Sequence, residues 1–194
     1  MTIRIYKDKE FRLLDGVYDP GDDSFLLVDA ALREASPGEK VLEIGTGSGI
    51  VSLFVKDIAD VVATDINPEA ARNARLNGVQ VIRTDLFNGI CGKFDLVIFN
   101  PPYLPTADEE RLSGWLNRAF DGGPTGRNEI IRFLENADEI LAPGGRVLLV
   151  ISSLTGIEEI EKLFEDKGFS VQALCSKKVS FEKLVVLKCV RHGH

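Results

Sequence analysis

The chain has 194 residues, of which 44% are hydrophobic and 27% charged, and its net charge is −7 at neutral pH. This length is enough for one domain with a buried core and short for two. The acidic balance argues against tight binding of nucleic acid through many phosphate contacts, and no apolar run is long enough to cross a bilayer.

The N-terminal stretch MTIRIYKDKEFR contains no apolar segment with a cleavage site, so we expect a cytoplasmic protein without a membrane partner. The three cysteines are dispersed and form no CxxC pattern: Cys91, Cys175 and Cys189. Both histidines, His192 and His194, lie in the terminal RHGH. These residues predict small core cysteines in a reducing compartment and no metal site.

The first 36 residues are expected to form a hairpin and a helix ahead of the main sheet. Ile3–Tyr18 has short apolar runs on either side of Lys7-Asp8-Lys9, which favours a hairpin. Asp22-Asp23-Ser24 is typical of a helix cap, and the helix is predicted over Phe25–Glu34. We therefore expect one domain over 1–194, with this unit at 1–36 and a core at 37–194.

In the core, short β-branched runs alternate with helical patterns. This alternation predicts an α/β fold, a Rossmann-like and mostly parallel sheet of seven strands with helices on both faces. No helix separates the last two strands, so one strand should be antiparallel. The predicted strands are Lys40–Ile44, Val61–Thr64, Val79–Ile82, Phe94–Phe99, Arg146–Ile151, Gly168–Cys175 and Phe181–Val190, and the predicted helices are Ser48–Ile58, Pro68–Asn77, Arg127–Leu141 and Thr155–Lys167. Ala142-Pro143-Gly144-Gly145 is expected to close a helix and lead into the next strand.

A glycine-rich turn, Glu43-Ile44-Gly45-Thr46-Gly47-Ser48-Gly49, follows the first strand of the core. Ligands of such sheets bind beyond the carboxyl ends of the strands, and glycine allows a ligand to approach the backbone. The turn departs from the dinucleotide fingerprint, which requires glycine at the position of Ile50. By itself the turn is a weak signal.

Three carboxylates lie at or just past the ends of three successive strands: Glu43, Asp65 and Asp85. Together they would repel a pyrophosphate, but they suit a ligand that carries an ammonium and a sulfonium, as S-adenosylmethionine does. The alternative for each residue alone is a helix cap or a solvated turn. Three in series favour the cofactor.

The tetrapeptide Asn100-Pro101-Pro102-Tyr103 follows the buried strand FDLVIF. The Asn100 side-chain oxygen and a proline carbonyl can accept both N–H groups of a planar NH2, which holds the nitrogen for methylation. The prolines stiffen the turn, and Tyr103 can pack on the flat target. The alternative is a turn that only terminates the strand.

These motifs resemble those of class I S-adenosylmethionine-dependent methyltransferases. By that resemblance, Gly45, Gly47 and Gly49 line the methionine part, Glu43 lies near the cofactor's amino end, Asp65 binds the ribose hydroxyls, and Asp85 with Leu86 marks the adenine. The predicted cofactor-binding residues are Ser24, Glu43, Gly45, Thr46, Gly47, Gly49, Asp65, Ile66, Asp85, Leu86 and Asn100. Asn100, Pro101, Pro102 and Tyr103 form the predicted catalytic motif.

Two further stretches resemble the HemK family: Val17–Leu27, as Tyr-x-Pro-x-x-Asp-Ser-x-x-Leu, and the glycine loop Phe120–Arg127. HemK-family enzymes methylate the glutamine of the Gly-Gly-Gln motif in class I translation termination factors. The chain starts almost directly at the Tyr-x-Pro element, as the short archaeal and eukaryotic members do. The resemblance implies that Ser24 contacts the cofactor's carboxylate, also as a helix cap, and that a small zinc-binding activator subunit is a possible partner.

We therefore expect a protein glutamine N5-methyltransferase acting on a release factor. The alternative is a DNA or RNA amino-methyltransferase acting on adenine N6 or guanine N2. Such an enzyme must extrude a base into a basic cleft, and neither the length nor the charge of the chain indicates this.

The segment Thr106–Arg127 is long and contains the one tryptophan, Trp115. It is predicted to be either a lid over the substrate or a short amphipathic helix over Glu109–Phe120 that packs on the body. The sequence leaves both interpretations open.

Overall fold

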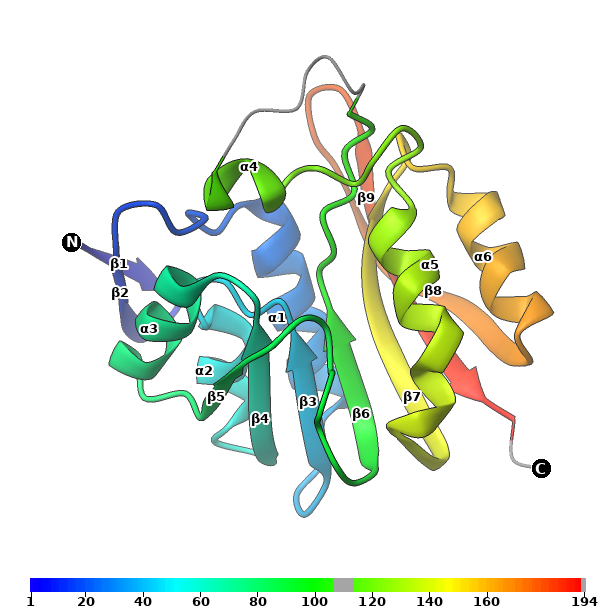
Figure 1. Ribbon diagram of the computed structural model, residues 1–194, viewed down its shortest axis with the longest axis horizontal. Helices are drawn as coiled ribbons and strands as arrows, with labels where there is room; N and C mark the ends of the chain where they lie inside the picture. Colours follow the sequence, from blue (N-terminus) through cyan, green and yellow to red (C-terminus); the bar gives the residue numbers. More distant parts are fainter. Residues whose placement is uncertain (107–113, 193–194) are drawn as a thin grey trace.

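The computed structural model describes residues 1–106 and 114–192. Its main sheet has the strand order β5-β4-β3-β6-β7-β9-β8, and β9 runs antiparallel to both neighbours while the other pairs are parallel (Figure 1). The strands are β3 Lys40–Ile44, β4 Asp60–Asp65, β5 Val81–Arg83, β6 Phe94–Phe99, β7 Leu141–Ser152, β8 Phe169–Lys178 and β9 Lys183–Arg191. The predicted seven-stranded sheet with one antiparallel member is confirmed.

Helices cover both faces of this sheet, as predicted. On one face lie α1 Asp22–Glu34, α2 Ile50–Val55 and α3 Pro68–Leu76, and on the other α5 Asn128–Asn136 and α6 Ile157–Asp166. Strand β6 serves both cores, because Leu96 and Ile98 pack beneath the first group of helices and Val97 and Phe99 beneath the second. A strand buried on both faces reads as a continuous apolar run, which is why FDLVIF was recognisable.

The N-terminal hairpin is present as β1 Thr2–Tyr6 and β2 Lys9–Leu13. The predicted cap of the following helix is wrong: α1 begins at Asp22, its N-cap is Gly21, and no side chain caps it. Asp23 and Ser24 therefore lie in the first turn of α1. This shift turns the Asp23 carboxylate toward the end of the main sheet.

The largest difference from the sequence prediction lies before β7. Helix α5 ends at Asn136, a 3-10 turn follows over Ala137–Glu139, and β7 already begins at Leu141. The expected linker Ala142–Gly145 is a bulge inside β7, because the pairing passes from Phe94↔Leu141 directly to Leu96↔Arg146. Proline cannot donate a ladder hydrogen bond, so a bulge accommodates Pro143 within a strand.

Smaller differences concern helix α2 and the region near Trp115. Helix α2 spans Ile50–Val55 and is shorter than predicted. Trp115–Arg118 forms the short helix α4, drawn above the sheet in Figure 1. The first part of the predicted helix Glu109–Phe120 and part of the predicted lid fall on 107–113, outside the described residues. No helix within 1–106 or 114–192 is long and apolar enough to span a membrane.

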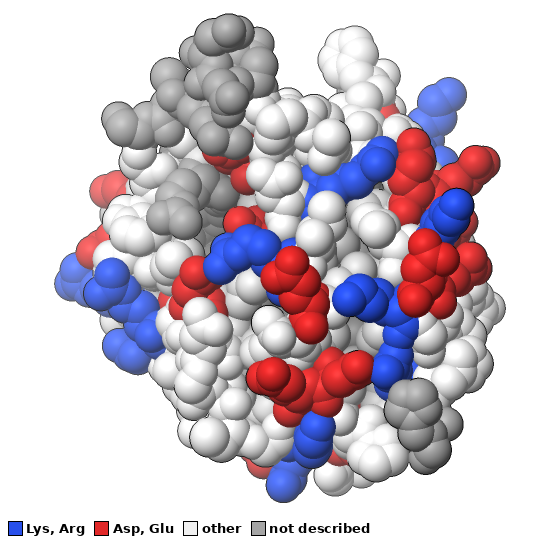
Figure 2. All heavy atoms as spheres, turned by 45° about the vertical axis from the view of Figure 1, so that its right-hand side comes forward, with Lys and Arg blue, Asp and Glu red and all other residues white. Residues whose placement is uncertain are grey.

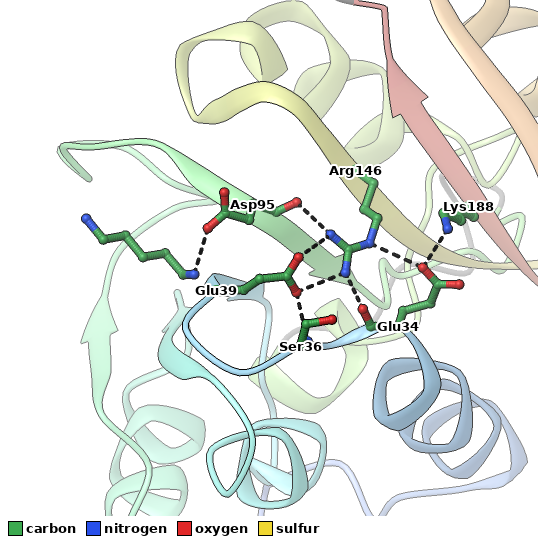
Figure 3. Close-up of polar contacts among 7 residues, drawn as sticks. Glu34, Ser36, Glu39, Asp95, Arg146 and Lys188 are labelled. Atoms are coloured by element: carbon green, nitrogen blue, oxygen red, sulfur yellow. Dashed lines mark hydrogen bonds and ion pairs between the residues drawn. The ribbon is translucent and has the colours of Figure 1, made fainter.

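Arg146 joins several elements at the amino edge of the sheet (Figure 3). Its guanidinium donates to both oxygens of Glu39 at 2.9 and 3.0 Å and to Glu34 Oε2 at 3.2 Å. It also donates to the backbone carbonyls of Glu34 and Asp95, and Lys188 pairs with Glu34 at 2.7 Å. These contacts tie α1 and the loop before β3 to strands β6, β7 and β9.

Replacing Arg146 by Met should lower the free energy of unfolding by about 2 to 4 kcal/mol, because the partly buried Glu39 loses its cationic partner and Glu34 keeps only Lys188. The change is measured by urea denaturation. Arg4→Met is the matched control: Arg4 pairs with Asp19 at 2.7 Å, but both side chains are about half exposed, so the loss should be much smaller than in Arg146→Met. Equal losses in the two variants would contradict the role of Arg146.

Candidate active site

A cavity of about 360 Å³ lies at the carboxyl ends of β3, β4 and β6, the edge toward which these strands point in Figure 1. It brings together residues from α1, from the glycine turn and from the segments that follow three further strands. Of the sequence-predicted site residues, the lining includes Ser24, Glu43, Gly45, Thr46, Gly47, Asp65, Ile66, Asp85, Leu86, Asn100, Pro101, Pro102 and Tyr103. The predicted Gly49 is not among the lining residues.

Gly49 instead allows α2 and α3 to pack closely. A Cβ atom at this position would lie 3.0 Å from the Cα and Cβ atoms of Ala74, and its φ of +84° disfavours other residues. Gly45 and Gly47 have positive φ as well, and a Cβ on Gly47 would meet no atom within 4 Å. The glycines of the turn therefore have two roles. Gly45 and Gly47 line the cavity without a side chain, and Gly49 allows α2 to pack closely against α3.

Glu43 is buried and shares one carboxylate oxygen among three donors. Oε2 accepts from Thr46 Oγ1 at 2.7 Å, from Ser52 N at 3.0 Å and from the Ser52 hydroxyl. Burial raises the pKa of Glu43 to about 7, and the charge of nearby Asp65 adds to this. The hydrogen bonds act in the opposite direction but do not cancel the desolvation.

Asp65 sits at the end of β4 and organises the backbone around it. Oδ2 accepts from Gly47 N and Oδ1 from Asn67 N, each at 2.8 Å. Burial nevertheless raises its pKa. Each carboxylate oxygen retains a further lone pair, so the side chain can still accept hydrogen bonds from a diol in the cavity.

The third predicted carboxylate is already paired. Arg132 of α5 donates to Asp85 Oδ2 at 2.7 Å and to Glu129 Oε2 at 2.7 Å, and it also lines the cavity. Leu86, next to Asp85, adopts a positive φ of 50°, and its carbonyl accepts from Thr64 Oγ1 at 2.7 Å. A non-glycine residue in the left-handed region at a cavity wall is typical of functional sites.

Asn100 and Tyr103 of the tetrapeptide converge on Asp23. Asn100 Nδ2 donates to Asp23 Oδ2 at 3.0 Å, and the Tyr103 hydroxyl donates to the same oxygen at 3.4 Å. On the other oxygen, Asp23 accepts from the Tyr18 hydroxyl at 3.0 Å and from Ser24 N at 2.6 Å. The Asn100 Oδ1 atom is buried and has no hydrogen-bond partner among the described residues.

Several of these residues were not predicted from the sequence. Asp23 and Tyr18 lie inside the Tyr-x-Pro-x-x-Asp-Ser element, but the prediction assigned a site role only to Ser24. Arg132 was missed altogether, because nothing in the local pattern of α5 distinguishes it from a surface arginine. A contact between residues that lie far apart along the chain produces no periodic pattern in the sequence, so it could not be predicted from such a pattern.

The cavity suits S-adenosylmethionine by the chemistry of its donors and acceptors. Glu43 and Asp65 are carboxylates without a cationic partner among the described residues, which favours a cationic ligand over a phosphate. Ser24, Gly45 and Gly47 also line the cavity, and the two glycines present no side chain there. Within 1–106 and 114–192, no group of three His, Cys, Asp or Glu residues could hold a metal ion.

Comparisons with known proteins identify the family of the chain. Residues 15–114 match the family model of the methyltransferase small domain. MJ0928 of Methanocaldococcus jannaschii, described as a proposed protein N5-glutamine methyltransferase, is 40% identical over 94% of this chain and 95% of its own length. The human methyltransferase HEMK2 is 39% identical, covering 89% of this chain and 88% of its own.

Among solved structures, Mtq2 from the E. cuniculi Mtq2–Trm112 complex, which methylates the termination factor eRF1, superimposes with a TM-score of 0.77. It is 29% identical, and the match covers 91% of this chain and 99% of the solved one.

The raised pKa of Glu43 predicts a pH-dependent cost to stability. The unfolded chain ionises Glu43 above its ordinary pKa of 4.5, whereas the folded chain resists ionisation until about 7. Between these values stability is lost as the pH rises, by roughly 3 kcal/mol for a shift of this size. Unfolding measured from pH 4.5 to 8 should show this loss in the wild type relative to Glu43→Gln.

Glu135→Gln provides the control for this measurement, because Glu135 is exposed on α5. Its stability should follow that of the wild type across the whole pH range. If the Glu43→Gln curve also ran parallel to the wild type, the buried carboxylate would carry no such penalty.

Proposed function

The chain belongs to the HemK family of class I methyltransferases, and we propose that it transfers a methyl group to the side-chain amide of the glutamine in the Gly-Gly-Gln motif of a class I release factor. S-adenosylmethionine is the proposed methyl donor and S-adenosylhomocysteine the product. The observation that carries the proposal is the buried Oδ1 atom of Asn100, which lacks a hydrogen-bond donor among the described residues.

A buried carbonyl oxygen without a donor costs about 1 to 3 kcal/mol, so its presence requires an explanation. Asn100 cannot relieve it by turning its amide over, because Asp23 offers only acceptors to the other end of the side chain. A donor that enters the cavity would relieve it. The NH2 group of a glutamine side chain is such a donor, and it carries the nitrogen to be methylated.

The remaining residues of the tetrapeptide fit the same task. A second acceptor is available from the Pro101-Pro102 backbone, where the rings fix the chain and remove the N–H groups. The Tyr103 ring is half-buried on the cavity wall, and burial raises its pKa, so the phenol stays neutral. Two acceptors on one NH2 group orient the nitrogen lone pair and weaken its conjugation with the carbonyl.

When bound, S-adenosylmethionine supplies an electrophilic methyl group. The chain's part is to hold the amide nitrogen in place, to bind the ribose hydroxyls through Asp65, and to exclude water. By the same proposal, Ser24 and Glu43 bind the amino-acid end of the cofactor, and Asp85 with Leu86 borders the adenine. The methylated nitrogen releases one proton to solvent, for which no base is required.

A protein substrate agrees better with the surface than a nucleic acid does. Positive and negative side chains intermingle on the face shown in Figure 2, and no broad basic area is visible there. The solved relative Mtq2 is described as part of a complex that methylates eRF1, and MJ0928 is described as a proposed glutamine methyltransferase. These names favour a release factor over DNA or RNA, and the cytoplasm as the compartment.

We also propose that the chain works with a small zinc-binding activator subunit. Mtq2 was solved as a complex with Trm112. The present chain exposes large apolar side chains outside the cavity, with Ile3 and Ile5 of β1 at 59% and 68% exposure and Ile82 of β5 at 44%. A partner that covers such residues would increase solubility and stability.

The decisive assay incubates the protein with labelled methyl donor, an archaeal-type release factor, the same factor with its Gly-Gly-Gln glutamine changed to alanine, and duplex DNA. Label is expected in the first factor alone. Asn100→Ala should abolish turnover while the affinity for S-adenosylmethionine stays within about 1 kcal/mol of wild type. Label in DNA, or equal label in both factor forms, would overturn the proposed substrate.

Asp65→Ala should weaken S-adenosylmethionine binding by about 10- to 100-fold, because hydrogen bonds to an ionised group are lost. Isothermal titration calorimetry measures this directly. Asp60→Ala, at the exposed start of the same strand, is the control and should bind normally. Unchanged affinity in Asp65→Ala would count against its proposed contact with the ribose.

A further inference from the structure

Asp23 connects the two halves of the active site, although no motif assigned it a role. It lies in the first turn of α1 and is only 5% exposed. Its Oδ1 atom faces Tyr18 and Ser24, and its Oδ2 atom faces Asn100 and Tyr103. One carboxylate therefore touches both the residue proposed to bind the cofactor and the residues proposed to bind the substrate.

The contacts of Asp23 leave it no capacity to act as a base. Oδ1 accepts from the Tyr18 hydroxyl, from Ser24 N and from Ser24 Oγ at 3.0, 2.6 and 3.1 Å. Oδ2 accepts from Asn100 and Tyr103 at 3.0 and 3.4 Å. An ionised carboxylate offers about four lone-pair sites, so these donors saturate it. A saturated carboxylate can orient its neighbours but cannot take a proton from the substrate.

Burial raises the pKa of both tyrosines, Tyr18 and Tyr103, so their hydroxyls stay protonated and continue to donate. Asp23 thus has only donors around it. The only orientation of the Asn100 amide that satisfies Asp23 is the one with Nδ2 toward the carboxylate. In that orientation Oδ1 is left as the free acceptor.

We propose that Asp23 is the positioning residue of the methyl-transfer site, which fixes the Asn100 amide so that Oδ1 is presented to the substrate NH2 group. The proposal rests on the proposed function, since it names a residue that acts through Asn100. It assigns Asp23 two effects. The carboxylate selects the amide orientation, and its negative charge polarises the amide so that Oδ1 becomes a stronger acceptor.

The substitution Asp23→Asn tests this, because it keeps the shape and removes the charge. With a neutral partner, the Asn100 amide can adopt either orientation. The kcat should fall by about 10- to 100-fold, whereas KM for the release factor and for S-adenosylmethionine should stay within about threefold. Asp22→Asn is the matched control: Asp22 is the neighbouring residue, half exposed and paired with Lys177 at 2.8 Å, and its kcat should not change.

A spectroscopic signature tests the contact without turnover. The side-chain NH2 signals of Asn100, identified by their loss in Asn100→Ala, should include one proton shifted downfield and slow to exchange in the wild-type protein. Asp23→Asn should remove that shift, and Asp22→Asn should not. The wild-type signal stands even if Asp23→Asn fails to fold.

Three outcomes would overturn the proposal: a wild-type Asn100 signal with free exchange of both protons, a normal kcat in Asp23→Asn, or a rise in KM for S-adenosylmethionine with kcat unchanged. The last would make Asp23 a part of the cofactor site. If the wild type methylated no release factor but the NMR signature were present, the proposed function would fail while the positioning contact held.

Discussion

The hydrogen bond between Asn100 and Asp23 is the contact on which the geometry of the site depends. Asn100 follows the central strand β6, and Asp23 lies in the first turn of helix α1, which packs across the sheet through Leu27 and Val28. Separating the two polar groups would leave a buried carboxylate and a buried amide unpaired, which is costly in an apolar surrounding. The apolar packing of α1 on the sheet and the hydrogen bond between Asp23 and Asn100 therefore both fix the position of α1 relative to β6.

The two edges of the sheet differ in whether their buried polar and charged groups have partners. At the amino edge, Arg146 compensates Glu34 and Glu39, and these contacts hold elements together without any free acceptor being needed. At the carboxyl edge, Glu43 has a raised pKa and Asn100 Oδ1 has no partner among the described residues. Unfavourable groups of this kind persist only where the surrounding fold is stable enough to tolerate them. The amino edge contributes to that stability.

Much of the fold was predictable because its signals are local. The continuous apolar run of β6 predicts a strand that is buried on both faces. A polar residue directly after such a strand must lie at the carboxyl edge of the sheet. That reasoning led to Glu43, Asp65 and Asn100. It failed at β7, where Pro143 indicated a linker although the chain forms a bulge within a strand.

It also missed Asp23 and Arg132, for the same physical reason. Their partners, Asn100 and Asp85, lie far along the chain, and such pairs depend on how helices pack rather than on any periodic pattern. The positions of strand ends can be read from a sequence. Which helix residue reaches them depends on helix rotation and on where each helix starts. A shift in the start of α1 from Phe25 to Asp22 was enough to change the role of Asp23.

The carboxylates that line the cavity differ in whether a positive charge compensates them, and this difference bears on which ligand the cavity suits. Arg132 compensates Asp85, whereas Glu43 and Asp65 have no cationic partner among the described residues, and burial, with the charge of Asp65 adding to it, raises the pKa of Glu43. A ligand with its positive charges near the unpaired carboxylates and a neutral ring near the compensated Asp85 would match these charges, as the proposed cofactor does. A cation near Glu43 would lower the pKa of that carboxyl again, since opposite charges stabilise the ionised form. Binding of a cation would therefore offset the unfavourable burial of the Glu43 carboxylate in the free protein. The phosphate groups of a nucleotide are anionic and would not have this effect.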